Sequence, residues 1–215
     1  MSEPMVAARK LIELSVAMRE HGLPLMQRIL PSDHSAEQWA HYPPDDAVSP
    51  HNGSRYFYHC HPPEERGDHE HGHFHMFLPL SLFQKDLSVS APVADGAKRA
   101  EVVHFAALSV NTSGLPEQLF TVNRWVTDEW LFPAEAIIER LDAYDLSEAD
   151  GDELVNGWLT AFVLLAKIEI STLLGQRDRL LAAKGWPGED RAFEVTSIAK
   201  IDLQAMLERA LIDEP

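Results

Sequence analysis

The chain has a single cysteine, Cys60, among its 215 residues. One cysteine cannot form an internal disulfide, and this scarcity is typical of proteins that fold in a reducing compartment. The first residues, M-S-E-P, also lack a basic region followed by an apolar run. We therefore expect no signal peptide and a cytoplasmic location.

Basic residues are scarce as well: Lys and Arg number 18 against 34 Asp and Glu, and the formal net charge is −16. Because this charge repels phosphate backbones and anionic lipid surfaces, we expect neither nucleic acid nor a membrane as a partner. The most apolar stretch, residues 154–174, contains Asn156, Lys167 and Glu169. These polar groups favour a buried helix over a membrane span. Nothing in the sequence indicates an oligomeric state.

Several familiar motifs are missing. The chain has no internal repeat, no G-x-S-x-G, no P-loop and no paired-cysteine motif. The sequence therefore gives no indication of a nucleophilic serine elbow, a phosphate cradle or a thiol redox pair. Hydrophobic residues make up 45% of the chain, which is enough to bury a core, and we expect residues 1–215 to form one domain.

Histidine, in contrast, is concentrated in residues 55–78, which hold six of the eleven in the chain. Strand alternation predicts two sets that each share one face: His59 and His61 in a first strand, and His71, His73 and His75 in a second. The alternate positions are suited to a core and support the same period: Tyr56, Tyr58, Cys60, Phe74, Met76 and Leu78. Turn residues at 62–68 separate the two strands, so the sequence predicts a hairpin.

Antiparallel neighbours bring facing side chains to about 5 Å, so imidazoles on both strands can converge on one ion. Neutral imidazole suits zinc, iron, copper and nickel. We therefore expect a transition metal ion as cofactor, with iron or zinc ahead of copper or nickel. A pH-sensitive or merely solvated histidine cluster is the alternative that these residues leave open.

Two more strands are expected after the hairpin. Residues 101–111 are apolar on both faces, which is typical of a central strand. Alternation places His104 in this strand with Val102, Ala106 and Leu108, as a further ligand or as a hydrogen-bonded core histidine.

The fourth expected strand covers residues 119–127. Arg124 would share a face with Phe120 and Val122, whereas Asn123 would lie on the opposite, polar face beside Trp125. This polar face is either a pocket wall or part of an ordinary edge strand.

The remaining chain is predicted to be mostly helical. Periodic apolar residues indicate helices at 4–21, 153–184 and 197–212, and the prolines of residues 42–53 indicate a loop. We thus expect an α+β fold, with an antiparallel sheet of about four strands (residues 55–127) flanked by N-terminal and C-terminal helices. The helical parts would be residues 1–41 and 133–212.

Two resemblances to known families follow from these motifs. The string Gly53, His59-Cys60-His61, Glu65 and Gly72 satisfies the first metal-binding motif of the cupins, but their second motif is absent around His104. The chain more closely resembles an uncharacterised bacterial family, a domain of unknown function. Its motifs Y-H-x-H, E-H-G-H-F-H and L-F-T-x-N-R-W-V-T match residues 58–61, 70–75 and 119–127. The resemblance implies no activity and no functional residues.

The expected function is that of a histidine-rich metal-dependent enzyme, hydrolytic or oxidative, with a small-molecule substrate. Glu70 would orient a ligand histidine or act as a base, while Asn123 and Arg124 would bind an anionic or carbonyl substrate. The alternative is a non-catalytic protein that binds or handles transition metals. Three or four ligands are expected from the same six histidines: His59, His61, His71, His73, His75 and His104.

Overall fold

The computed structural model describes residues 2–31, 36–65, 69–94, 96, 100–185 and 192–212. Within them, six antiparallel strands form one sheet in which spatial order follows chain order. The predicted α+β class is confirmed, although the sheet has six strands and not about four. The strands are β1 (Tyr42–Val48), β2 (Arg55–His59), β3 (Glu70–Pro79), β4 (Val102–Asn111), β5 (Pro116–Val122) and β6 (Val195–Lys200).

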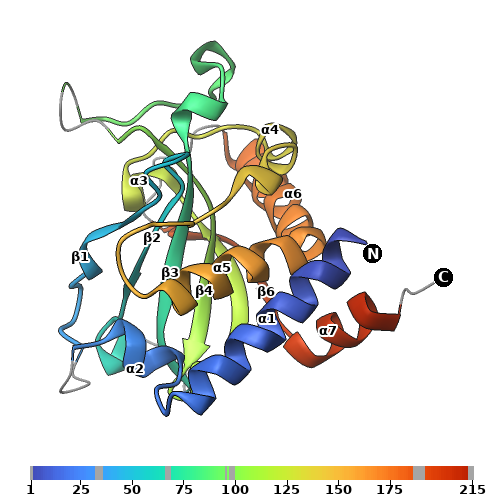
Figure 1. Ribbon diagram of the computed structural model, residues 1–215. Helices are drawn as coiled ribbons and strands as arrows, with labels where there is room; N and C mark the ends of the chain where they lie inside the picture. The colour runs from blue at the N-terminus through green and yellow to red at the C-terminus, as the bar shows by residue number, and fades with distance from the viewer. Residues whose placement is uncertain are drawn as a thin grey trace.

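Helices from both ends of the chain cover one face of this sheet. In Figure 1, α1 and α5 cross in front of the strands, and α6 and α7 lie beside them. Helix α5 packs against α1, and α6 packs against β4, β5 and β6. The helices are α1 (Glu3–Glu20), α2 (Leu25–Ile29), α3 (Arg124–Thr127), α4 (Ala134–Ile138), α5 (Glu153–Leu165), α6 (Lys167–Lys184) and α7 (Leu203–Ile212).

The main core lies between the sheet and these helices. Strand residues such as Tyr58, Phe74 and Leu108 are fully buried there, together with helical residues such as Leu159 and Leu173. The opposite face of the sheet carries only small apolar clusters among the described residues, one of them formed by Phe57, Phe77 and Val102. Helices therefore close one face of the sheet, while the face that carries the histidines is left for a cavity.

Two of the six strands were not predicted. Residues 42–53 were expected to form a loop because of their prolines, but β1 pairs with β2 there. As an edge strand, β1 tolerates prolines because one row of its N–H groups needs no partner. Residues 197–212 were expected to be one helix, but β6 (Val195–Lys200) precedes α7. The segment V-T-S-I-A-K is rich in β-branched residues and pairs with β5.

Two element boundaries also differ from the prediction. The strand expected over residues 119–127 ends at Val122, and Asn123 is the N-cap of the short helix α3. The long helix expected over residues 153–184 is bent by 70° between α5 and α6. No proline or glycine stands at the bend, so the local sequence did not indicate it. Asp152 caps α5 by accepting hydrogen bonds from two backbone N–H groups.

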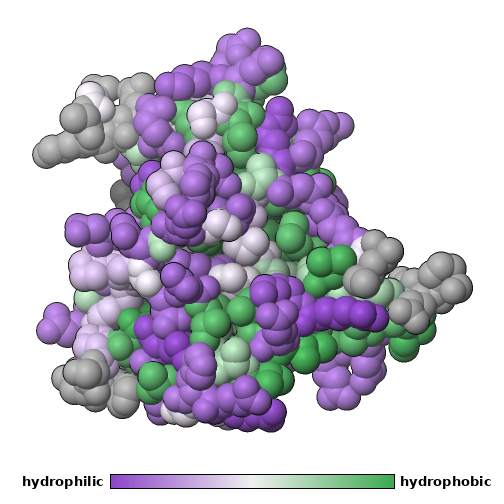
Figure 2. Space-filling model, in the orientation of Figure 1, coloured by the Kyte–Doolittle hydropathy of each residue, from purple (hydrophilic) through white to green (hydrophobic). Residues whose placement is uncertain are grey.

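In the part of the chain that the structure describes, no single helix has the length and apolar character needed to cross a membrane; α5 and α6 meet that test only when taken together across their bend. Hydrophilic side chains cover most of the face shown in Figure 2, with hydrophobic patches between them. That pattern accords with the strongly acidic composition of the chain.

Candidate metal centre

The predicted hairpin is formed by β2 and β3. Its register places His59 opposite His73, and Phe57 opposite His75. Because directly opposed residues project to the same side of an antiparallel pair, all four rings lie on one face of the sheet. The core residues Tyr58 and Phe74, which are also paired, project to the other face, as the alternation predicted.

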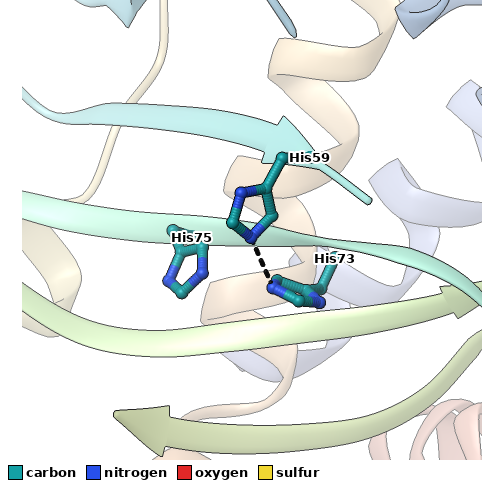
Figure 3. A group of neighbouring side chains, drawn as sticks. All are labelled: His59, His73 and His75. Carbon is teal, nitrogen blue, oxygen red and sulfur yellow. Dashed lines mark hydrogen bonds between the residues drawn. The ribbon is translucent and has the colours of Figure 1, made fainter. Parts of the chain in front are cut away.

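Three imidazoles come together at the end of the hairpin. The ring centroids of His59 and His73 are 4.5 Å apart, and those of His59 and His75 are 5.1 Å apart. Figure 3 shows the three rings projecting from β2 and β3, with the Nε2 atoms of His59 and His73 joined by a hydrogen bond of 2.7 Å. His73 and His75 are buried, and His59 is only 9% exposed. The cluster thus draws its donors from both strands.

His73 and His75, the two members of the cluster on β3, each use the Nδ1 atom for a supporting contact. The Nδ1–H of His73 donates to Oε1 of Glu70 at 2.7 Å, and the same oxygen accepts from the hydroxyl of Ser109 at 3.2 Å. Nδ1 of His75 is 3.1 Å from Nε2 of His104. These contacts leave the Nε2 atoms of His73 and His75 to face a metal ion. Such outer partners orient ligand histidines and raise their basicity.

The donor set fits a transition metal ion. The candidate ligand nitrogens of His59, His73 and His75 all lie within 4.8 Å of one another. Two nitrogens on a tetrahedral zinc lie about 3.3 Å apart, because each Zn–N bond is about 2.0–2.1 Å long. Three imidazoles leave at least one coordination position open.

Burial keeps the imidazoles of His59, His75 and His104 uncharged. Desolvation and the neighbouring His73 lower the pKa of His59 from 6.5 to about 2. Burial and the nearby Arg177 lower the pKa of His104 from 6.5 to about 3. The pKa of His75 also lies well below 6.5, again chiefly because of burial. His59, His75 and His104 are therefore neutral at pH 7, and the neutral imidazole is the form that binds a metal ion.

We expect the free energy of unfolding of the metal-free protein to fall as the pH drops from about 7.5 to about 5.5. The folded-state pKa values of His59, His75 and His104 are below 6.5. Below that pH, the unfolded chain takes up protons that the folded protein does not bind. Each histidine then contributes a loss of up to about 1.4 kcal/mol per pH unit. Urea unfolding of chelator-treated protein at both pH values measures the loss.

His104→Gln provides the control for this pH dependence. Burial raises the pKa of Glu129 well above 4.5, so that group contributes a slope of opposite sign in the same pH range. The difference between His104→Gln and the parent protein cancels the Glu129 contribution. The slope of the free energy of unfolding against pH is set by the protons taken up on unfolding, and we expect the variant to take up fewer by about one proton. Equal slopes would show that His104 is not a buried neutral imidazole.

The other three predicted ligand histidines lie outside the group of three. His61 follows β2, with its ring 5.0 Å from that of His59 and 4.2 Å from that of Trp39. His104, in the neighbouring strand β4, is in contact with His75. His71 does not share the face of His73 and His75, contrary to the prediction. A register shift between Glu70 and Gly72 turns it away, and its Nδ1 is 2.5 Å from the hydroxyl of Tyr58.

A second irregularity changes the predicted phase of β4. The register shifts between the pairs Met76–Ala106 and Phe77–His104. Phe105 and Ala106 consequently both belong to the main core, whereas His104 lies on the histidine face. The prediction that His104 shares a face with Ala106 and Leu108 is therefore wrong. The bulge is what brings its ring to His75.

Asn123 and Arg124 are not brought to the histidines. The Nδ2 group of Asn123 donates to the carbonyl of Phe193, and Nη1 of Arg124 donates to Asp128 at 3.2 Å. Both side chains are buried. Neither is among the described residues that line the cavity beside the cluster. The predicted face-sharing of Arg124 with Phe120 and Val122 fails because β5 ends before it.

That cavity has a volume of about 1010 Å³ and includes the three histidines in its wall. Several of its residues were not singled out from the sequence. His41 stacks on Phe57 with ring centroids 3.8 Å apart, and its Nδ1 lies 3.0 Å from Oδ1 of Asp46. Trp39 and Arg55 also line the cavity. Arg55 precedes His59 in the same alternation, a signal that could have identified it; nothing local in the sequence indicated His41.

The comparisons with known proteins identify a family without a known activity. A family model described as Domain of unknown function (DUF6969) matches residues 5–201. The match confirms the resemblance to a family of unknown function. No curated protein and no solved structure matches the chain.

Proposed function

Because the chain belongs to the family described as Domain of unknown function (DUF6969), we propose its function from the geometry of the site: a metal-dependent enzyme that acts on a small molecule. One observation carries the proposal. Three convergent imidazoles, His59, His73 and His75, stand in the wall of a cavity of about 1010 Å³. A cavity of that size accommodates a small organic substrate next to an open coordination position.

The donor chemistry favours zinc and hydrolysis within this proposal. Catalytic zinc sites use three protein ligands, and an all-histidine set is one of their known forms. In the facial triad of iron oxygenases, two histidines and a carboxylate bind the ion, but here Glu70 is hydrogen-bonded to His73. Iron, copper and nickel also accept imidazole ligands. When bound, such an ion would polarise a coordinated carbonyl or phosphoryl oxygen and acidify coordinated water.

Residues of this chain supply the remaining roles. Glu70 holds His73 in one orientation through the 2.7 Å hydrogen bond. His41 serves as the acid–base group, because Asp46 fixes its Nδ1 and leaves Nε2 for a proton of the substrate or of water. Its ring lies 6.0 Å from that of His59 and lines the cavity. Burial of the three ligands limits access of water from the core side.

The proposal is tested by metal analysis followed by an activity screen. Purified protein, desalted and analysed for elements, is expected to hold at least one first-row transition ion per chain. The loaded protein is then assayed against panels of carboxylic esters, amides and phosphate esters. His41→Gln should retain the metal and lower turnover about a hundredfold or more. The matched control is His51→Gln, because exposed His51 forms a comparable pair with Glu148 at 3.1 Å and should change neither property.

A non-catalytic metal-binding or metal-handling protein is the alternative function. It predicts a fully occupied coordination shell and no need for the cavity. Metal binding without turnover in the screen, combined with a closed coordination shell in X-ray absorption spectra, would support this alternative. Protein that binds neither zinc, iron, copper nor nickel after reconstitution would contradict both functions.

A further inference from the structure

Arg55 is a cation in the cavity wall. It is the one arginine or lysine among the described residues that line the cavity. Its Nε atom is buried and has no hydrogen-bond partner in the described part of the chain. Two of the four acidic lining residues, Asp46 and Glu70, are already engaged by His41 and His73. A buried guanidinium donor in this state is suited to an anion that enters the cavity.

The position of Arg55 relative to the imidazoles is set by β2. Arg55, Phe57 and His59 alternate along one face of the strand, so the Cα atoms of Arg55 and His59 are about 13 Å apart. Arg55 is paired with Phe77 across the hairpin. Phe57 is opposite His75 in the same register, and the rings of Phe57 and Phe77 are 5.7 Å apart. The cavity therefore has a cationic end, an apolar middle and an imidazole end.

We propose that Arg55 binds the carboxylate of a small amphipathic acid whose apolar part lies against Phe57 and Phe77. The other end of such a molecule reaches the histidine cluster; that placement of the reacting group rests on the proposed function, whereas the carboxylate subsite does not. A single planar guanidinium matches a carboxylate through two parallel hydrogen bonds. A phosphate dianion is disfavoured because the same wall carries the carboxylates of Asp46, Glu65, Glu70 and Glu194.

The test uses the full chain after removal of metal with a chelator, so that coordination cannot contribute to binding. Calorimetry compares 4-phenylbutyrate with its uncharged amide. We expect the parent protein to prefer the carboxylate, and Arg55→Gln to bind it at least about tenfold more weakly while binding the amide equally. Arg55→Lys should fall between the two, because lysine retains the charge but not the planar fork. Arg19→Gln, an exposed position on α1, is the matched control and should bind as the parent protein does.

Three outcomes would overturn the proposal: equal binding of carboxylate and amide by the parent protein, unchanged carboxylate binding by Arg55→Gln, or no binding of either compound. If Arg55→Gln does not fold, the proposal is still tested by the carboxylate affinity of Arg55→Lys and by the preference of the parent protein for the carboxylate over the amide. Tighter, Arg55-dependent binding of 2-phenylethyl phosphate would assign the subsite to phosphate and reject the carboxylate. A failure of the proposed function is seen separately, as the absence of metal in the parent protein, because carboxylate binding is measured without metal.

Discussion

Replacing His73 with alanine is expected to leave the purified protein with almost no bound transition metal. His73 is the central member of the cluster, since its Nε2 is 2.7 Å from that of His59 and its ring centroid is 4.9 Å from that of His75. Two imidazoles in an open cavity cannot replace a set of three, because each lost ligand also loses the orientation that its outer partner supplies. Elemental analysis after desalting measures the metal content, and circular dichroism verifies that the variant is folded.

Two neighbours of His73 sharpen this experiment. Glu70→Gln should weaken metal binding by about 10- to 100-fold, because it removes the carboxylate that orients His73 but leaves all three ligands. His69→Ala is the matched control: His69 is exposed and lies directly before β3. If the histidine-rich hairpin bound metal only adventitiously, His73→Ala and His69→Ala would each lose a similar fraction of the bound metal. Full metal content in His73→Ala, or equal losses in His73→Ala and His69→Ala, would contradict a specific site.

Alternation within a strand was sufficient to predict the centre of the site. His59, His73 and His75 were placed on one side, and Tyr58 and Phe74 on the other, because a strand has a period of two wherever its ladder is regular. The prediction holds over residues 55–59 and 73–77, where β2 and β3 pair without interruption. Alternation thus predicts the facing of a side chain correctly wherever the folded strand is paired without a bulge.

The same rule failed at irregularities that depend on pairing with another strand. A bulge at His71 rotates that ring toward Tyr58, and a bulge at Phe105 carries His104 to the histidine face. Gly72 adjoins the first bulge and is a local signal for an irregular strand, whereas no glycine or proline stands at the second. His41 and Asp46 reach the cavity only because β1 pairs with β2. Sequence reasoning did not find His41, since edge pairing of a proline-containing segment is decided by tertiary contacts.

Gly72→Ala is expected to unfold the protein more readily, by about 3 kcal/mol in the free energy of unfolding. A Cβ atom at Gly72 would overlap the backbone carbonyl oxygen of His59 and the hydroxyl of Tyr58, and would lie 2.8 Å from Cζ of Tyr58. A backbone oxygen cannot rotate away, and Tyr58 is fully buried. The two strands must therefore separate at the point where the hairpin approaches the histidines. A loss of this size lowers the melting temperature by roughly 6–12 °C in a chain of this length.

Gly175→Ala is the matched control and should have the opposite sign. Gly175 lies inside α6, where the added Cβ meets only Nη1 of Arg179, at 3.6 Å. Alanine in a helix interior is favoured over glycine by up to about 1 kcal/mol. Thermal unfolding of both variants therefore separates the general effect of a methyl group from the specific contact at β3. Because Gly72 adjoins His73, Gly72→Ala should also lose metal affinity, whereas Gly175→Ala should retain it. Equal melting temperatures for the two variants would mean that β2 and β3 do not approach each other as closely as this register requires.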